Sequence, residues 1–244
     1  MTLPREIGDA AQDADKDAVM AWLNAGGSID DVDDGGYTLV NCCAAGGLVD
    51  EIIRDGHVAL ARDLIALGAD VNIVCTVDGD TPLLRVLNHR DRDQGQMNMF
   101  SLLLAAKASV NVSNWNGQSP LCLAILRPSE PSTTMVTELL RAGASLDACR
   151  GNETAEDVIQ SKERNDPAVA ENEHWRATKR LVVGVRQHGS YKRYARSFHR
   201  DVLAVRGLAQ RGKLRTDDPV LNFLARLGDN GVCWHILSFW RATN

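Results

Sequence analysis

One stretch of the chain comes close to a phosphate-binding loop. The residues GLAQRGKL at 207–214 place two glycines and a lysine at the spacing with which a loop cradles phosphate groups. Such a loop also needs a Ser or Thr directly after the lysine to hold magnesium, but Leu214 stands there. A strand should precede the loop, whereas a helical pattern precedes it here and the turn formers TDDP follow it. The stretch therefore predicts no nucleotide site.

Side chains that could bind a metal or perform catalysis do not occur in the patterns that those functions need. Cys233 and His235, taken with His199, come nearest to a zinc site, but they lack paired spacing and a fourth ligand, so we interpret them as core residues. No G-x-S-x-G or H-E-x-x-H motif is present. Acidic pairs such as Asp30-Asp31 fall in predicted loops, where solvent keeps carboxylates ordinary. We therefore expect no enzyme, no metal and no cofactor.

Charge is distributed unevenly along the chain. Residues 173–244 hold fourteen Lys and Arg against five Asp and Glu, a net charge of +9, while residues 1–172 have a net charge of −14. Such asymmetry indicates either a basic segment for an external polyanion or two oppositely charged parts that dock on each other or on a protein. We favour the second interpretation.

Nucleic-acid binding is the alternative from a different class. Residues 176–215 contain twelve basic residues and one acidic residue, interleaved with Tyr191, Tyr194 and Phe198, which is typical of a surface that follows a phosphate backbone. Against it, the sequence pI is about 5.7 and no RNA- or DNA-binding motif is present. An acidic scaffold would also repel the same polyanion. We therefore expect a protein partner rather than nucleic acid.

The elements that must position any binding residues are helices. With 44% apolar but only 5% aromatic residues, the core must consist mainly of Leu, Ala, Val and Ile, which favours packed helices. Two patterns alternate along the chain. The first, a small turn residue followed by Thr or Ser and an apolar stretch, occurs at 36–45, 79–87, 117–125 and 152–159. The second, an apolar stretch that ends in a small-residue turn, occurs at 21–30, 63–72, 101–111 and 138–147.

Each pattern has residues suited to begin or end a helix. Pro82 stands at a first helical position, where its missing N–H has no cost, and Thr81 just before it can cap the helix; Ser119-Pro120 repeats the arrangement. Gly68, like Gly143, can take the left-handed conformation that ends a helix. The patterns therefore predict alternating helix starts and helix stops.

Over roughly residues 4–165 these patterns resemble the ankyrin repeat, G-x-T-P-L-H-x-A-A followed by an apolar helix that ends in L-L-x-x-G-A-D-V-N. The chain departs from it where Leu39 replaces Pro, where Asn41, Leu84 and Cys122 replace His, and where Lys107 replaces the helix-ending Gly. The resemblance implies an all-α solenoid of stacked helix pairs joined by hairpin connectors, which binds proteins through its concave face and connector tips. We expect four to five repeats over residues 1–189, with the first and last atypical, and a small basic helical module at 190–244.

The spacing of the patterns indicates which end of this stack binds. Insertions lengthen the segments between the two helices of a pair, whereas the connectors between pairs keep a nearly constant length. The regular connector end is therefore the predicted binding surface. Its predicted partner-binding residues are Asp33, Tyr37, Asp78, Asp80, Trp115, Asn116 and Gln118. They would suit a basic or amphipathic protein segment. Trp115 lies among turn formers, and either an interface anchor or a ring folded onto a neighbouring connector fits this context.

The last fifty residues form a different, apolar and basic module. Its candidate contact residues are Arg193, Arg196, Arg200, Trp234, Phe239 and Trp240. The ending GVCWHILSFW is similar to the F-box pattern, and an ankyrin array followed by a short helical box is similar to ubiquitin-ligase adaptors of the SOCS-box type. The resemblance implies recruitment of ubiquitin-ligase subunits. The alternative is a module that caps the repeat stack.

Neither an export signal nor a membrane span is predicted. The first residues, MTLPREIGDAAQDAD, lack a basic and then apolar leader, and no apolar run approaches the roughly 18 to 20 residues of a spanning helix. The six cysteines form no CxxC pair, and we interpret them as reduced. We therefore expect a cytoplasmic or nuclear protein without membrane contact.

Overall fold

The computed structural model describes residues 2–47, 52–89, 94–127, 130–197 and 211. The chain divides into two compact units, residues 1–186 and 187–244. Both described parts are helical, which confirms the predicted all-helical class; within these ranges the only β-type pairings are two isolated bridges, one between Gln118 and Arg150 and one between Arg150 and Glu153. No helix in the described ranges is long and apolar enough to cross a membrane.

The first unit is built from successive helices. They are α1 (Arg5–Gln12), α2 (Lys16–Asn24), α3 (Leu39–Ala45), α4 (Asp55–Ala66), α5 (Pro82–Asn88), α6 (Gln94–Ala105), α7 (Pro120–Ile125), α8 (Glu130–Arg141), α9 (Ala155–Asn165), the 3-10 helix η1 (Pro167–Glu171) and α10 (Glu173–His188). The short first helix of each pair contacts the longer second helix, as in α3 with α4, α5 with α6 and α7 with α8.

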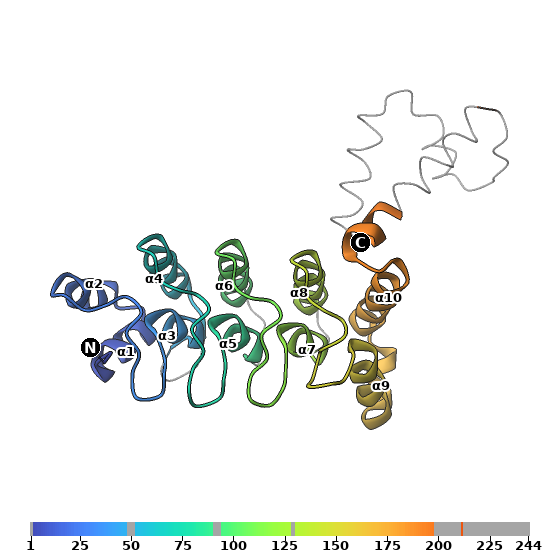
Figure 1. The fold of residues 1–244 in the computed structure, drawn as a ribbon, viewed down its shortest axis with the longest axis horizontal. Coiled ribbons are helices and arrows are strands. Elements are labelled where there is room, and N and C mark those ends of the chain that lie inside the picture. The colour runs from blue at the N-terminus through green and yellow to red at the C-terminus, as the bar shows by residue number, and fades with distance from the viewer. Residues whose placement is uncertain (1, 48–51, 90–93, 128–129, 198–210, 212–244) are drawn as a thin grey trace. The chain divides into compact units, whose positions relative to one another are not determined.

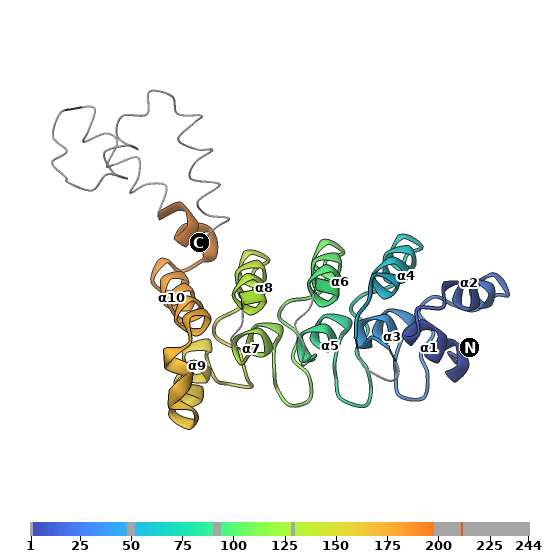
Figure 2. The same ribbon diagram turned by 180° about the vertical axis from the view of Figure 1, so that it is seen from behind.

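These pairs stand side by side in two rows (Figures 1 and 2). One row contains α1, α3, α5 and α7, and each of these helices contacts the next one in the row. The other row contains α2, α4, α6 and α8, in which α4 contacts α6 and α6 contacts α8. Leucines from both rows are fully buried, including Leu39, Leu83, Leu121, Leu64 and Leu103. The apolar core therefore runs continuously from pair to pair.

Hydroxyl side chains cap the first turns of α5 and α7, as predicted. Thr81 accepts a hydrogen bond from the backbone N–H of Leu84, and Ser119 accepts one from the N–H of Cys122, while Pro82 and Pro120 occupy the first turns. The same cap recurs at Thr38 and Thr154. Each cap satisfies a helical N–H that would otherwise lack a partner.

Left-handed residues follow the second-row helices. Gly68 and Gly143 have φ angles of 102° and 96°, which confirms their predicted conformation. At the equivalent point after α6 the chain has Lys107, with a φ of 66°. A side chain at positive φ is strained, so this helix ends in the same way but at a higher energetic cost.

Two histidines connect neighbouring helix pairs, His57 from the first turn of α4 and His89 from the end of α5. His57 is buried; its Nδ1 accepts a hydrogen bond from the N–H of Arg54, so its Nε2 donates to the carbonyl of Gln12 at 2.7 Å. His89 Nε2 lies 2.9 Å from the carbonyl of Ala44. Each ring thus connects its own pair to the C-terminal end of the preceding first-row helix.

The helix α10 closes the described part of the first unit. The sequence pattern predicts a helix over 173–189 with an apolar side, and α10 confirms it, because Trp175, Val182 and Val185 are buried. On the α8 side, the Thr133 hydroxyl donates to the carbonyl of His174. The unit therefore ends on a packed helix.

Candidate functional site

The predicted binding end consists of four connectors between helix pairs, which extend on the side of the first row that faces away from the second row (Figure 1). We number them connector 1 (25–38), connector 2 (67–81), connector 3 (106–119) and connector 4 (142–154). Each of the first three is a hairpin closed by a backbone hydrogen bond. These bonds are Asp33 N–H to Tyr37 O at 3.1 Å, Cys75 N–H to Asp80 O at 3.0 Å and Asn114 N–H to Gln118 O at 3.1 Å.

Backbone hydrogen bonds also join each connector to the next. Thr76 donates its N–H to Gly35 O at 3.0 Å, and Trp115 donates to Asp78 O at 3.0 Å. Gly151 continues the series by donating to Gly117 O at 2.8 Å. The four connectors therefore form one continuous hydrogen-bonded edge.

Short polar side chains add a second row of bonds between connectors. Asp30 accepts from the N–H of Asp70 at 2.8 Å, Asn72 from Ser109 at 2.7 Å, and Asn111 from Ser145 at 2.8 Å. Each connector is thus held to its neighbour at two levels. These bonds hold the connector backbones to one another.

Most of the predicted acidic residues already have partners within this edge. One oxygen of Asp33 accepts from the N–H groups of Gly35 and Tyr37, both at 2.9 Å. Asp78 accepts from the N–H of Asp80 at 2.9 Å. These carboxylates therefore stabilise their own turns. The presence of acidic residues in the sequence does not show this role.

The structure differs most from expectation at Asp80, which was predicted to be displayed. Its side chain is only 1% exposed, and its Oδ1 accepts from Asn114 Nδ2 of the next connector at 3.0 Å. Burial raises the pKa of Asp80 above its ordinary value, the Asn114 hydrogen bond opposes the rise, and the nearby charge of Asp78 adds to it. Asp80 thus links two connectors instead of facing a partner.

Arg85 organises the centre of the edge and was missed by the sequence analysis. From α5 its guanidinium binds Asp78 Oδ2 at 2.8 Å and lies over the ring of Tyr37, 4.9 Å from the centroid. Burial is the main cause that raises the pKa of Tyr37, and a hydrogen bond with Cys75 adds to it. The predicted residues Tyr37 and Asp78 therefore come together, but around a cation of the same chain.

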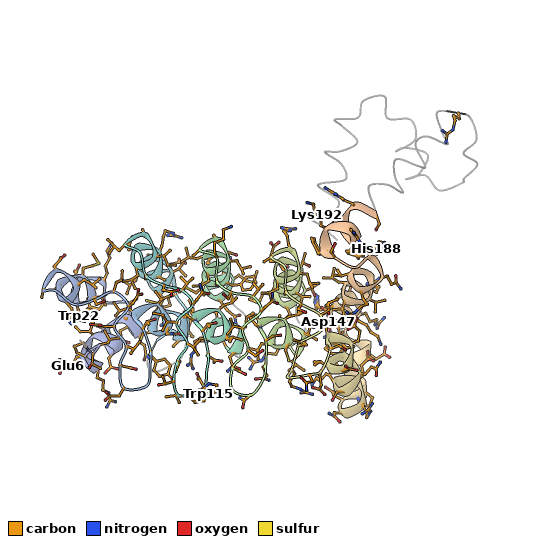
Figure 3. The ribbon with its side chains drawn as sticks, in the orientation of Figure 1. Glu6, Trp22, Trp115, Asp147, His188 and Lys192 are labelled. Carbon is orange, nitrogen blue, oxygen red and sulfur yellow. The ribbon has the colours of Figure 1, made fainter. Side chains whose placement is uncertain are left out.

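Trp115 remains available on this edge. Its side chain is 66% exposed and lies at the connector end of the molecule (Figure 3). The ring passes over Gly79, where an added Cβ would lie 2.5 Å from ring atom Cδ1. The ring therefore rests on the neighbouring connector, as one of the two interpretations predicts, and is still largely exposed. Asn116 beside it is exposed, and Gln118 is half-buried.

Exposed apolar side chains near Trp115 were not predicted. Val77 in connector 2 is 60% exposed and Val74 is 42% exposed. Asp34 is the exposed acidic residue of connector 1. A hydropathy pattern cannot find such residues, because an isolated apolar residue in a turn is indistinguishable from one folded inward.

The predicted residues of the C-terminal module are only partly described. Arg193 and Arg196 are exposed. Arg200, Trp234, Phe239 and Trp240 lie outside the described residues, as do Cys233, His235, His199 and most of the phosphate-loop-like stretch at 207–214.

Arg186 and Lys179 of α10 are paired with acidic residues of the first unit. Arg186 forms two hydrogen bonds with Glu156, of 2.8 and 2.9 Å, and also binds Asp147. Lys179 binds Glu163 at 2.9 Å, and the same carboxylate accepts from the Trp175 indole N–H. Part of the charge asymmetry in the sequence is therefore neutralised inside the unit.

No group of His, Cys, Asp and Glu among the described residues could hold a metal ion. The described cysteines are free thiols and are buried, and burial raises the pKa of Cys42 to about 12. A comparison with known protein families found no match, and a comparison with curated proteins found none either.

Proposed function

We propose that residues 4–165 form an ankyrin-type stack and that the protein is a non-enzymatic scaffold that binds another protein along the connector edge. The paired helices, the Thr or Ser caps before their first helix and the left-handed residues after their second helix support this proposal. A stack of this kind buries its core by packing each pair on the next, which leaves the connectors to carry recognition.

Trp115 is the observation that carries the proposal. Tryptophan is enriched among the residues that dominate binding energies, and here two thirds of the side chain is exposed. A large apolar ring at a turn tip is unfavourable in water unless something covers it. Val77, in the neighbouring connector, is a second exposed apolar residue on this edge.

Rigidity of the edge would favour binding. The N–H of Trp115 is held by Asp78 O, and its ring rests on Gly79, so both its backbone and its side chain are positioned in advance. Association then loses less conformational entropy than it would on a mobile loop.

The chemistry of the edge favours an amphipathic partner segment. An apolar side chain would cover Trp115 and Val77, and a basic side chain would meet Asp34, which is exposed. Because Asp33 and Asp78 are already engaged, the partner's positive charge would contribute mainly to encounter and orientation.

The test compares three forms of the full chain: the wild type, Trp115→Ala and the control Val183→Ala. Val183 is an exposed apolar residue of α10, 39% exposed, and does not belong to the connector edge. Each form is used for a native-lysate pull-down with quantitative mass spectrometry, and circular dichroism checks its folding. Proteins recovered with the wild type and Val183→Ala but lost with Trp115→Ala are the expected result.

Equal recovery with all three proteins would overturn the proposed surface. A thermal melt separates binding from stability, since we expect Trp115→Ala to lower the melting temperature by only a few degrees. A large loss of stability would instead show that the ring is structural.

A further inference from the structure

The second unit has a positive net charge, whereas the first unit has a negative one. Residues 187–244 contain ten Lys and Arg against four Asp and Glu, a net charge of +6. Residues 1–186 contain seventeen against twenty-eight, a net charge of −11. The two units therefore differ in sign, and the division falls inside the segment that the sequence marks as basic.

The basic residues on the two sides of this division differ in their surroundings. In the first unit, Arg176 pairs with Glu171, and both Lys179 and Arg186 pair with carboxylates of α9. Their charges are therefore already matched. Arg180 is the one basic residue at 176–186 without an ion pair in the described ranges, so this part of the basic segment offers little unmatched charge to an external polyanion.

Three basic residues of the second unit have no acidic partner among the residues that the structure describes. Residues 191–197 are helical and follow Gly189, whose φ is 73°, and Ser190, whose Oγ accepts from the N–H of Arg193. Within the described residues, Lys192, Arg193 and Arg196 make no ion pair, and all three are exposed; Lys192 is labelled in Figure 3. Residues three and four apart on a helix share a face, so these three charges lie together.

Two tyrosines accompany these charges. Tyr191 and Tyr194 are half-buried, and their ring centroids lie 6.4 Å apart. The Tyr194 ring also meets the His188 ring edge-on at 5.7 Å. Exposed cations beside partly exposed rings are the combination with which proteins bind single-stranded nucleic acids, because cations contact phosphates and rings stack on bases.

We propose that Lys192, Arg193 and Arg196 bind the backbone of single-stranded nucleic acid, with Tyr191 and Tyr194 beside them as surfaces on which bases stack. Within the described part of the basic segment 176–215, these three cations are exposed and unpaired basic residues of the second unit, and they support the nucleic-acid alternative that the sequence alone disfavours. An anionic membrane fits less well, because the two aromatic rings beside the cations offer stacking surfaces that bases use and lipid headgroups do not.

The test uses the full chain and a fluorescein-labelled strand of twenty uridines, with binding followed by fluorescence anisotropy. Three phosphate contacts predict that affinity falls about tenfold between 50 and 150 mM salt. The triple variant Lys192→Gln, Arg193→Gln, Arg196→Gln should bind at least tenfold more weakly at 50 mM salt and lose most of the salt dependence. Tyr191→Leu should weaken binding about fivefold at unchanged salt dependence.

A matched control removes the same charge elsewhere. Arg62, Lys107 and Arg180 are exposed basic residues of the first unit that make no ion pair within the described ranges, and their triple change to Gln should leave binding within about twofold of the wild type. The proposal is overturned if the wild type does not bind the strand at 50 mM salt, or if both triple variants weaken binding equally. Binding to phosphatidylserine vesicles but not to the strand would overturn it in favour of a membrane surface.

Discussion

At Gly79 the course of connector 2 depends on the absence of a side chain. Its φ is 76°, and an added Cβ would lie 2.8 Å from the backbone nitrogen of Trp115 as well as 2.5 Å from the ring. Gly68 has a φ of 102°, but nothing lies within 4 Å of the corresponding Cβ position. A side chain at Gly68 would therefore introduce only conformational strain, whereas one at Gly79 would also crowd connector 3.

We predict that Gly68→Ala lowers the free energy of unfolding by about 1–2 kcal/mol, which is the cost of a side chain at positive φ. Gly79→Ala should lower it by at least about 1 kcal/mol more, because connector 3 must also move away. Urea unfolding of both variants measures the difference. Equal losses would mean that the two connectors separate without resistance.

Lys107 allows the reverse substitution, in which a residue at positive φ is replaced by glycine. It ends α6 in the left-handed conformation that Gly68 and Gly143 adopt after α4 and α8. We predict that Lys107→Gly raises the free energy of unfolding by about 1 kcal/mol, because the strain disappears and exceeds the added entropy of the unfolded chain. Lys107→Ala removes the charge but keeps the strain, so it should leave the stability nearly unchanged. A stabilised Ala variant would point to charge instead of conformation.

The roles of some residues near the connector edge could be predicted from the sequence, and those of others could not. The caps at Thr81 and Ser119 were predictable because Thr-Pro or Ser-Pro acts on its own helix within one turn. The burial of Asp80 depends on Asn114, thirty-four residues away, and the position of Arg85 in α5 depends on Tyr37 in connector 1. Contacts between residues so far apart in the sequence cannot be predicted from a local pattern.

Among the elements, α10 is held to α9 by ion pairs whose strength depends on pH. The hydrogen bond from Arg186 is the main cause that lowers the pKa of Glu156 below its ordinary value of 4.5, and Lys179 is the main cause that lowers the pKa of Glu163. A carboxyl group whose pKa is lower in the folded state stabilises the fold above its unfolded pKa. That contribution is lost as the pH falls through the folded pKa.

We therefore predict that Arg186→Gln lowers the melting temperature at pH 7 and that this difference from the wild type shrinks steadily below pH 4.5. Arg180→Gln is the control, because Arg180 is exposed and binds no carboxylate among the described residues. Melting curves of the three proteins at several pH values test the prediction. A difference that persists unchanged to pH 3 would assign the role of Arg186 to packing.

The helical type of the elements could be predicted from local signals, but the lengths of the helices could not. The inserted segments between paired helices, such as 46–54 between α3 and α4, follow no fixed pattern. The start of the second helix of a pair depends on contacts with the preceding pair. At α4 the capping Arg54 donates its N–H to His57, and that ring in turn reaches α1. An element boundary set by a neighbouring pair cannot be predicted from its own residues.

At the scale of the whole molecule, the described apolar core ends within the first unit. Its last buried apolar residues are Val182 and Val185, and Trp175 in the same helix is 1% exposed. A chain that stops after Gly189 therefore keeps every described residue of this core. A chain that stops after Asn165 loses η1, Trp175 and the partners of Glu156 and Glu163.

We predict that the chain ending at Gly189 folds cooperatively and melts within about 5 °C of the full-length protein, while the chain ending at Asn165 melts much lower or does not fold. Loss of the buried Trp175 alone would account for about 3–5 kcal/mol of the second effect. Circular dichroism melts of the three chains provide the measurement. If the chain ending at Gly189 is unfolded, residues 190–244 cap the stack. Their basic and apolar residues would then stabilise the fold instead of recruiting a partner.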